Sequence, residues 1–272
     1  MSGPAIALDA ASAPPRLRGL GAGAALPRLV AGIVIVALWQ GIVRGLAPDY
    51  VATPFGIVMA FPRVVQSAAF LQATSRTLGA VAEGLVIALI LGTAIGLVMG
   101  RSVLGERALR HYVNAFYAMP MIVVLPLFSL WFGYSGAARL ATVVFAAIFS
   151  IIVSVADGAH AVPKDYVEVA RSFRSGRLRL LFEIVLPAAM PYFLAGLRLA
   201  AGRALIGAVV AEFFTAIDGL GYFILYNSRI FRHDEAMVAV VFLAGFGVGF
   251  DALVNWGTRR FLPWYRRDEV QE

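Results

Sequence analysis

Long apolar stretches separated by short polar segments dominate the pattern of this chain. Most of them approach the ~20 residues that a helix needs to cross a hydrocarbon layer of ~30 Å. A chain in lipid must satisfy its own backbone hydrogen bonds, so stretches of this length predict helices, and the alternation of a membrane barrel is not seen. The sequence therefore predicts an all-α membrane protein with six spans, at about 29–46, 78–100, 112–134, 140–156, 188–214 and 236–256.

The segments outside the spans differ in composition. Residues 1–28 are rich in small residues, proline and glycine and lack an apolar core, which predicts a disordered tail rather than a cleavable signal peptide. Residues 29–256 form the predicted membrane domain, and 257–272 a basic tail. Within the third span, Pro120 and Pro126 each remove a backbone donor, so we expect this helix to bend.

The distribution of basic residues predicts the orientation in the membrane. Fifteen of the 23 lysines and arginines fall at the two chain ends and in the connections after the second and fourth predicted spans. Five fall in the connections after the first, third and fifth spans. Because cytoplasmic loops carry the excess of lysine and arginine, both termini and the 157–187 loop are expected in the cytoplasm. Topology thus explains the net charge of +7 without a nucleic-acid partner, and the 60% hydrophobic content indicates a lipid bilayer as solvent.

The 157–187 loop carries a helical pattern. Pro163 suits the first turn of a helix, and apolar residues up to Phe173 recur at spacings of three and four. Ser175-Gly176 predicts a turn, and a second short helix would follow and end at Leu186-Pro187. Such a helix–turn–helix can rest on anionic headgroups or dock a cytoplasmic partner, and the pattern alone leaves both alternatives open.

The same loop resembles the signature loop of ABC importer permeases, which reads Glu-Ala-Ala, three residues, Gly, nine residues, Ile, one residue, Leu-Pro. The matching residues are Glu168, Ala170, Ile184, Leu186 and Pro187. Val169 replaces the second residue of the pattern, and Arg174 stands where the glycine is expected, with Gly176 nearest. Either Arg174 closes the first helix without a glycine or the break comes two residues later.

The resemblance covers roughly 75–265 and is closest to the nitrate, sulfonate and taurine branch, through the phrases "MPMIVVLPLFSLWFG", "AEFF…GLGYFI" and "RRFLPWYR". It implies a permease of the bacterial inner membrane that pairs with a second copy. A periplasmic binding protein would deliver a small anion such as an alkanesulfonate, although related members carry neutral pyrimidines. The loop would be the coupling helix that docks on an ABC ATPase, through Glu168, Val169, Ala170, Phe173, Arg174, Gly176, Ile184, Leu186 and Pro187.

Ionisable and small residues inside the spans are candidates for a translocation path. Arg203 lies deep in the fifth span, and the sequence leaves open whether it pairs with Glu83 or Asp251. Small residues in the same span favour close helix packing, either within the chain or against a second copy. Aromatic and methionine side chains near the two prolines suit a hydrophobic gate or a plain core. The candidate path residues are Met119, Pro120, Phe128, Arg203, Gly207 and Glu212.

Other chemistries are disfavoured. "GYSG" at 133–136 resembles a serine protease motif, but the histidines fall in loops, and no metal-ligand cluster is seen. The only lysine is Lys164, so no phosphate-binding loop exists, and ATP and magnesium would be bound by a partner ATPase, with no cofactor in this chain. The main alternative is an ion-gradient-driven secondary transporter, which intramembrane carboxylates favour and the lack of a clear internal repeat disfavours.

Overall fold

The computed structural model describes residues 25–46 and 51–261, and all regular elements in these ranges are helices. They fall into two units, one ending at Phe55 and the other beginning at Gly56. In the first unit, α1 (Ala25–Leu46) is apolar on nearly all sides, as suits a helix surrounded by lipid. The tail predicted for residues 1–28 overlaps α1, which begins at Ala25. Residues 1–24 lie outside the described chain.

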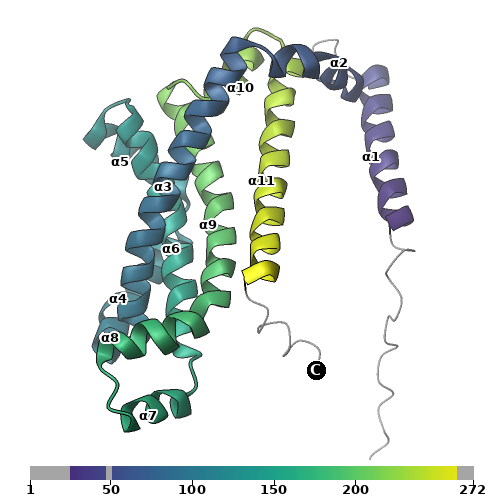
Figure 1. Cartoon of the computed structure of the whole chain (residues 1–272). Coiled ribbons are helices and arrows are strands. Elements are labelled where there is room, and N and C mark those ends of the chain that lie inside the picture. The colour runs from purple at the N-terminus through teal and green to yellow at the C-terminus, as the bar shows by residue number, and fades with distance from the viewer. Residues whose placement is uncertain (1–24, 47–50, 262–272) are drawn as a thin grey trace, which may run out of the picture. The chain divides into compact units, whose positions relative to one another are not determined.

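A bundle of three long helices forms the second unit. These are α3 (Ala68–Arg101), α6 (Gly136–His160) and α9 (Leu186–Thr215), and α6 packs along both of the others (Figure 1). The last helix, α11 (His233–Phe261), contacts α9 and the short helix α10 (Leu220–Arg229). The basic C-terminal segment accordingly starts within α11, and residues 262–272 lie outside the described chain.

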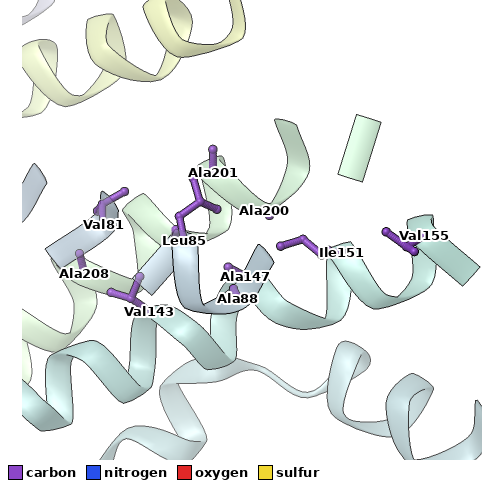
Figure 2. Close-up of a cluster of buried hydrophobic side chains, with 11 residues drawn as sticks. Val81, Leu85, Ala88, Val143, Ala147, Ile151, Val155, Ala200, Ala201 and Ala208 are labelled. Carbon is purple, nitrogen blue, oxygen red and sulfur yellow. The ribbon is translucent and has the colours of Figure 1, made fainter. Parts of the chain in front are cut away.

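Small side chains bring the three long helices together. The core cluster combines alanines with a few branched residues, among them Ala88, Ala147 and Ala200 (Figure 2). On α3, Gly92 and Gly96 face α6 so closely that a Cβ atom on Gly96 would lie 2.8 Å from the Ile152 carbonyl oxygen. Small residues four apart permit this backbone approach in a membrane, where lipid supplies no hydrophobic drive for helix association.

The stretch predicted as a third span, 112–134, is not one helix. It is divided between α4 (Val103–Ala118) and α5 (Met121–Phe132), whose axes differ by 99°. Met119 and Pro120 join the two helices, and both have extended backbone angles. Pro120 also lacks the amide hydrogen that would donate to the preceding turn. Five described helices are therefore long and apolar enough to cross a membrane, and the bent pair makes a sixth if it counts as one span.

Short helices cover the two ends of this unit. Helices α2 (Pro54–Val65) and α10 lie near the start of α3, and α7 (Lys164–Ser172) and α8 (Arg177–Leu180) lie at the opposite end (Figure 1). Polar connections at both ends and apolar helices between them are the arrangement that a bilayer requires.

The turn after α7 is centred on Arg174 rather than on Gly176. Arg174 has a φ of 54°, in the left-handed region, whereas Gly176 has no positive φ. The Ser175 amide donates to the Ala170 carbonyl at 3.0 Å, a bond that closes a Schellman-type helix end. The position where the resembling pattern has glycine is therefore the one that needs left-handed backbone, and here an arginine adopts it.

The expected helix end at Leu186-Pro187 is wrong. Helix α8 continues through a π-helical turn, Leu181–Val185, directly into α9. Pro187 then falls in the first turn of α9, where a missing amide donor costs little, and the wider π turn precedes it. The loop thus consists of α7 followed by a continuous helix that enters the bundle.

Candidate functional site

The break between α4 and α5 borders a pocket in the side of the bundle. Its volume is about 390 Å³, and α6 and α9 supply the other walls. A broken helix exposes backbone only where protein or a cavity surrounds it. The lining residues are Phe116, Tyr117, Ala118, Met119, Met121, Ile122, Phe145, Ala146, Phe149, Arg203 and Ile206.

Arg203 reaches this pocket from the middle of α9. Its guanidinium carbon lies 4.1 Å from the centre of the Tyr117 ring, which is a cation–π contact. No carboxylate pairs with Arg203 in the part of the chain that the structure describes. Of the two partners that the sequence left open, Asp251 instead binds Arg198 at 2.7 Å, and Glu83 is exposed.

Aromatic side chains form one wall of the pocket. Phe145 and Phe149, one turn apart on α6, have ring centres 5.1 Å apart, and Phe116 stacks on Phe149 at 5.7 Å. Phe128 of α5 joins the edge of this group through Phe145 at 5.8 Å. Phe145 and Phe149 were not among the predicted gate or path residues, although their four-residue spacing along one face of a helix was a usable signal.

The six candidate path residues are not gathered at one place. Met119 and Arg203 line the pocket, and Pro120 forms the helix break beside it. Gly207 instead packs on α6, where a Cβ atom would lie 3.1 Å from the Ala146 Cβ. The small residues of α9 therefore serve internal packing at this point.

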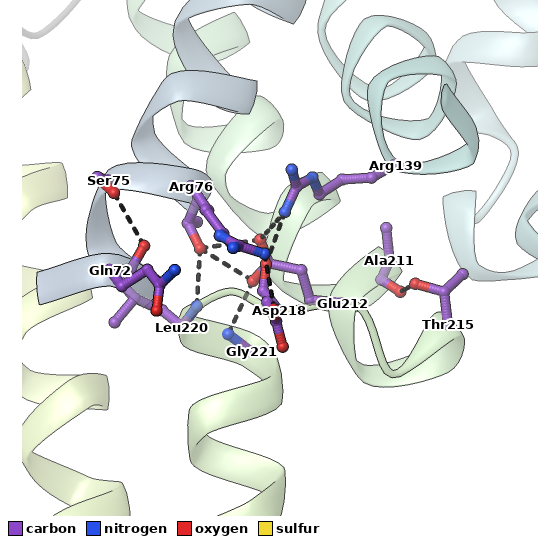
Figure 3. Close-up of polar contacts among 11 residues, drawn as sticks. Gln72, Ser75, Arg76, Arg139, Ala211, Glu212, Thr215, Asp218, Leu220 and Gly221 are labelled. Atoms are coloured by element: carbon purple, nitrogen blue, oxygen red, sulfur yellow. Dashed lines mark hydrogen bonds and ion pairs between the residues drawn. The ribbon is translucent and has the colours of Figure 1, made fainter. Parts of the chain in front are cut away.

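Glu212 lies in a separate polar cluster near the end of α9, and its side chain is fully buried (Figure 3). Its carboxylate accepts hydrogen bonds from the Thr77 hydroxyl at 2.8 Å, the Gly221 amide at 2.8 Å and the Arg139 guanidinium at 3.1 Å. A buried charge is tolerable only when it is paired and hydrogen-bonded, and these three donors supply both conditions.

The same cluster explains the spacing of "AEFF…GLGYFI". The chain turns back after α9, so that Gly219 lies against the Glu212 carboxylate, where a Cβ atom would overlap it. The Leu220 amide donates to the Thr77 hydroxyl at 2.7 Å, and Leu220 itself is fully buried. Glu212 therefore fixes the turn between α9 and α10 to α3, and the pocket described above does not include it.

The signature-loop residues divide into a packed and an exposed set. Ala170 is buried and Ile184 packs on the apolar cluster at the bundle end, whereas Glu168 is exposed. Val169 of α7 and Phe173, the residue directly after α7, are 56% and 82% exposed, and the Phe173 amide donates to the Val169 carbonyl at 3.2 Å, one helical turn away. An apolar ridge that points away from its own bundle is a feature of contact surfaces. Arg174, Gly176 and Pro187 are also exposed, and Leu186 is half-buried.

Comparison with known proteins identifies the family. Residues 84–267, more than half of the chain, match the family model for the binding-protein-dependent transport system inner membrane component. The chain belongs to this family and is thus a permease subunit of a transport system, as the loop and its flanking phrases indicated.

Individual relatives agree with this assignment. The chain is 29% identical to the formylaminopyrimidine transport permease of Halalkalibacterium halodurans, covering 86% of this chain and 94% of the relative. It is 29% identical to a putative aliphatic sulfonates transport permease of Bacillus subtilis (85% and 84% covered) and 34% identical to a nitrate import permease of Leptolyngbya laminosa (67% and 66%). The predicted nitrate and sulfonate branch is confirmed.

A solved structure shares the fold. An amino acid ABC transporter crystallised with histidines superposes with a TM-score of 0.62 at 18% identity, and the match covers 74% of this chain and 98% of that chain. The helical permease fold predicted from the apolar pattern is therefore confirmed.

Proposed function

We propose that this chain is the membrane subunit of an ATP-driven importer, and that α7 is the surface through which an ABC ATPase drives it. The observation that carries the proposal is the apolar ridge at the end of α7, with Val169 and Phe173 exposed while Val167 packs into the apolar cluster at the bundle end. Resting on lipid headgroups, the alternative role of this loop, does not require such an anchored ridge. Because the chain has no phosphate-binding loop, ATP and magnesium are bound by the partner.

The continuous helix after α7 supports a mechanical role. The four-residue turn at 173–176 joins α7 to α8, and from there a displacement reaches α9 along one helix, since α8, the π turn and α9 follow one another without a break. The π turn is the irregular point along this path, and such turns are frequent at functional sites. ATP-dependent closure of the ATPases would thus shift α9, on which Arg203 lies, relative to α4 and α5.

The orientation follows from the basic residues. The excess of arginine in the α7 connection and at both chain ends supports a cytoplasmic location for all three. The opposite end then faces the periplasm, where α2, α3, α10 and α11 surround a hollow of about 780 Å³ that is lined by both charged and apolar side chains. Charged residues on its rim, including the pair Arg63–Glu235 at 2.8 Å, suit contact with a solute-binding protein.

The solute passes beside the α4–α5 break in this proposal. Phe116, Met119 and Ile122 of the pocket are 43%, 39% and 51% exposed, so the pocket is open on one side. A second copy of the chain would close that side and complete the path, as expected for a permease dimer. The relatives named for nitrate and sulfonate transport favour a small anion as the solute, whereas the formylaminopyrimidine permease shows another class among the relatives.

Substitution of the exposed aromatic tests the proposed coupling. The Phe173→Ala variant, produced with its ATPase subunit, should remain in the membrane but lose ATPase co-purification, because it removes the most exposed apolar side chain of the ridge. Tyr134→Ala is the matched control, since Tyr134 is 74% exposed but lies between α5 and α6. Full ATPase retention by the Phe173 variant would contradict the coupling role.

The rival function has its own readout. A secondary transporter needs no ATPase, so proteoliposomes that contain the permease alone would take up nitrate or ethanesulfonate when an ion gradient is imposed. We expect no such uptake, and uptake only when the ATPase, ATP and the binding protein are present. Gradient-driven uptake by the permease alone would replace the importer proposal.

A further inference from the structure

We propose that Arg203 and the ring of Tyr117 form an anion-binding site that makes the pocket at the α4–α5 break selective for negatively charged solutes. The inference rests on the proposed path through this pocket and adds the residue that determines its charge preference. Arg203 is the one charged side chain among the described residues that line the pocket.

The neighbours of Arg203 leave its charge uncompensated. Two other arginines in or beside the bundle are neutralised by carboxylates, Arg198 by Asp251 at 2.7 Å and Arg139 by Glu212 at 3.1 Å. Arg203 faces the ring of Tyr117 instead. A ring quadrupole stabilises the guanidinium without cancelling its net charge, so a full positive charge remains available in the pocket.

The surroundings strengthen this charge. The rest of the wall is aromatic, aliphatic or methionine, and it contributes no second ion. In a low-dielectric cavity a charge is screened less than at an exposed surface, and its attraction for an anion is correspondingly larger. An uncompensated arginine at membrane depth is costly, which is why such residues mark substrate or ion pathways.

The shape of the site defines the ligand class. A volume of about 390 Å³ accommodates a small solute, and the guanidinium fork suits a planar or tetrahedral oxyanion. The phenylalanine wall formed by Phe116, Phe145 and Phe149 offers an apolar surface next to the charge. The fitting solute is therefore a small oxyanion, with or without a short apolar body.

The absence of cysteine in the chain permits a direct test of the pocket's charge preference. A single thiol is introduced by Met119→Cys, and a second position is provided by Ile122→Cys, both on the pocket wall. The reagents are two methanethiosulfonates of similar size, one anionic (sulfonatoethyl) and one cationic (trimethylammonium-ethyl). Their rates on the purified permease are expressed relative to their rates on a free small thiol.

The expected result is a preference for the anionic reagent by about tenfold after this correction, because the Arg203 cation, which lines the same pocket, attracts one reagent and repels the other. Adding Arg203→Gln should remove the preference, and adding Arg203→Lys should preserve it, since lysine keeps the charge. Arg198→Gln is the matched control, an arginine of the same helix that lies outside this pocket, and it should leave the ratio unchanged.

Three outcomes would overturn the inference. Equal corrected rates with Arg203 present, a preference that survives Arg203→Gln, or no reaction of either reagent at both thiol positions would each exclude an anion-selective pocket. The measurement uses neither the ATPase nor a transported solute. It can therefore fail while the Phe173 experiment succeeds, which separates this inference from the proposed function.

Discussion

The amide of Ser175 donates a 3.0 Å hydrogen bond to the carbonyl of Ala170, and this bond holds Arg174 between them in the left-handed region. The turn is the one that a glycine normally makes, and it ends α7. A β-carbon costs about 1–2 kcal/mol in this conformation.

Replacing Arg174 by glycine should therefore stabilise the loop. We expect Arg174→Gly to raise the free energy of unfolding by about 0.5–1 kcal/mol, since the relief of left-handed strain outweighs the chain entropy that glycine adds. Thermal unfolding of the permease in detergent is the measurement. Arg174→Ala keeps a β-carbon and should bring no gain, and Gly176→Ala is a nearby control without positive φ. A destabilised glycine variant would show that the arginine side chain itself holds the turn.

Neutralising Glu212 should destabilise the α9–α10 turn. Glu212→Gln leaves Arg139, whose side chain is only 13% exposed, without its counter-ion and weakens the bonds to Thr77 and Gly221. Breaking a buried pair costs about 3–5 kcal/mol, so we expect a large loss of thermal stability in detergent.

An exposed ion pair in the same region provides the comparison for Glu212. Asp218 binds Arg76 at 2.6 Å but is 61% exposed, so Asp218→Asn should cost about 1 kcal/mol or less. Similar losses for Glu212→Gln and Asp218→Asn would show that burial does not set the strength of the Glu212 cluster.

Two glycines of α3 should respond in opposite directions to alanine. Gly96→Ala inserts a methyl group 2.8 Å from the Ile152 carbonyl oxygen and should cost about 1–3 kcal/mol by overpacking the α3–α6 contact. Gly79 has nothing within 4 Å of the added carbon, so Gly79→Ala should be neutral or stabilise the helix by up to about 1 kcal/mol. Thermal unfolding of both variants in detergent checks the pair. If Gly79→Ala were the more damaging one, that face of α3 would have to lie against a further helix, such as one from a second copy.

The helices themselves were predictable because span length and apolar content are local properties. The bend near Pro120 was also predictable from the sequence, since proline removes a backbone hydrogen-bond donor in any context. The helix–turn–helix was predicted at the right place, but the residue that makes the turn was left open between two alternatives and the predicted end of the second helix was wrong. Arg174 rather than Gly176 makes the turn, and Leu186-Pro187 continues a helix that it was expected to end. The hydrogen bond from Ser175 to Ala170 decided the first point and the π turn decided the second, and neither has a signal in the apolar pattern.

By itself, the sequence determined that this chain is helical, spans a membrane and carries a basic loop that resembles the one in importer permeases. These properties depend on hydropathy and motif spacing, which are set over short distances along the chain. Only the tertiary structure decided which charges are neutralised. Asp251 pairs with Arg198, and Glu212 pairs with Arg139. Arg203 lies over the Tyr117 ring and has no carboxylate partner among the described residues. The partners are brought together by the packing of α3, α4, α6, α9 and α11, and that geometry depends on contacts between residues far apart in the chain.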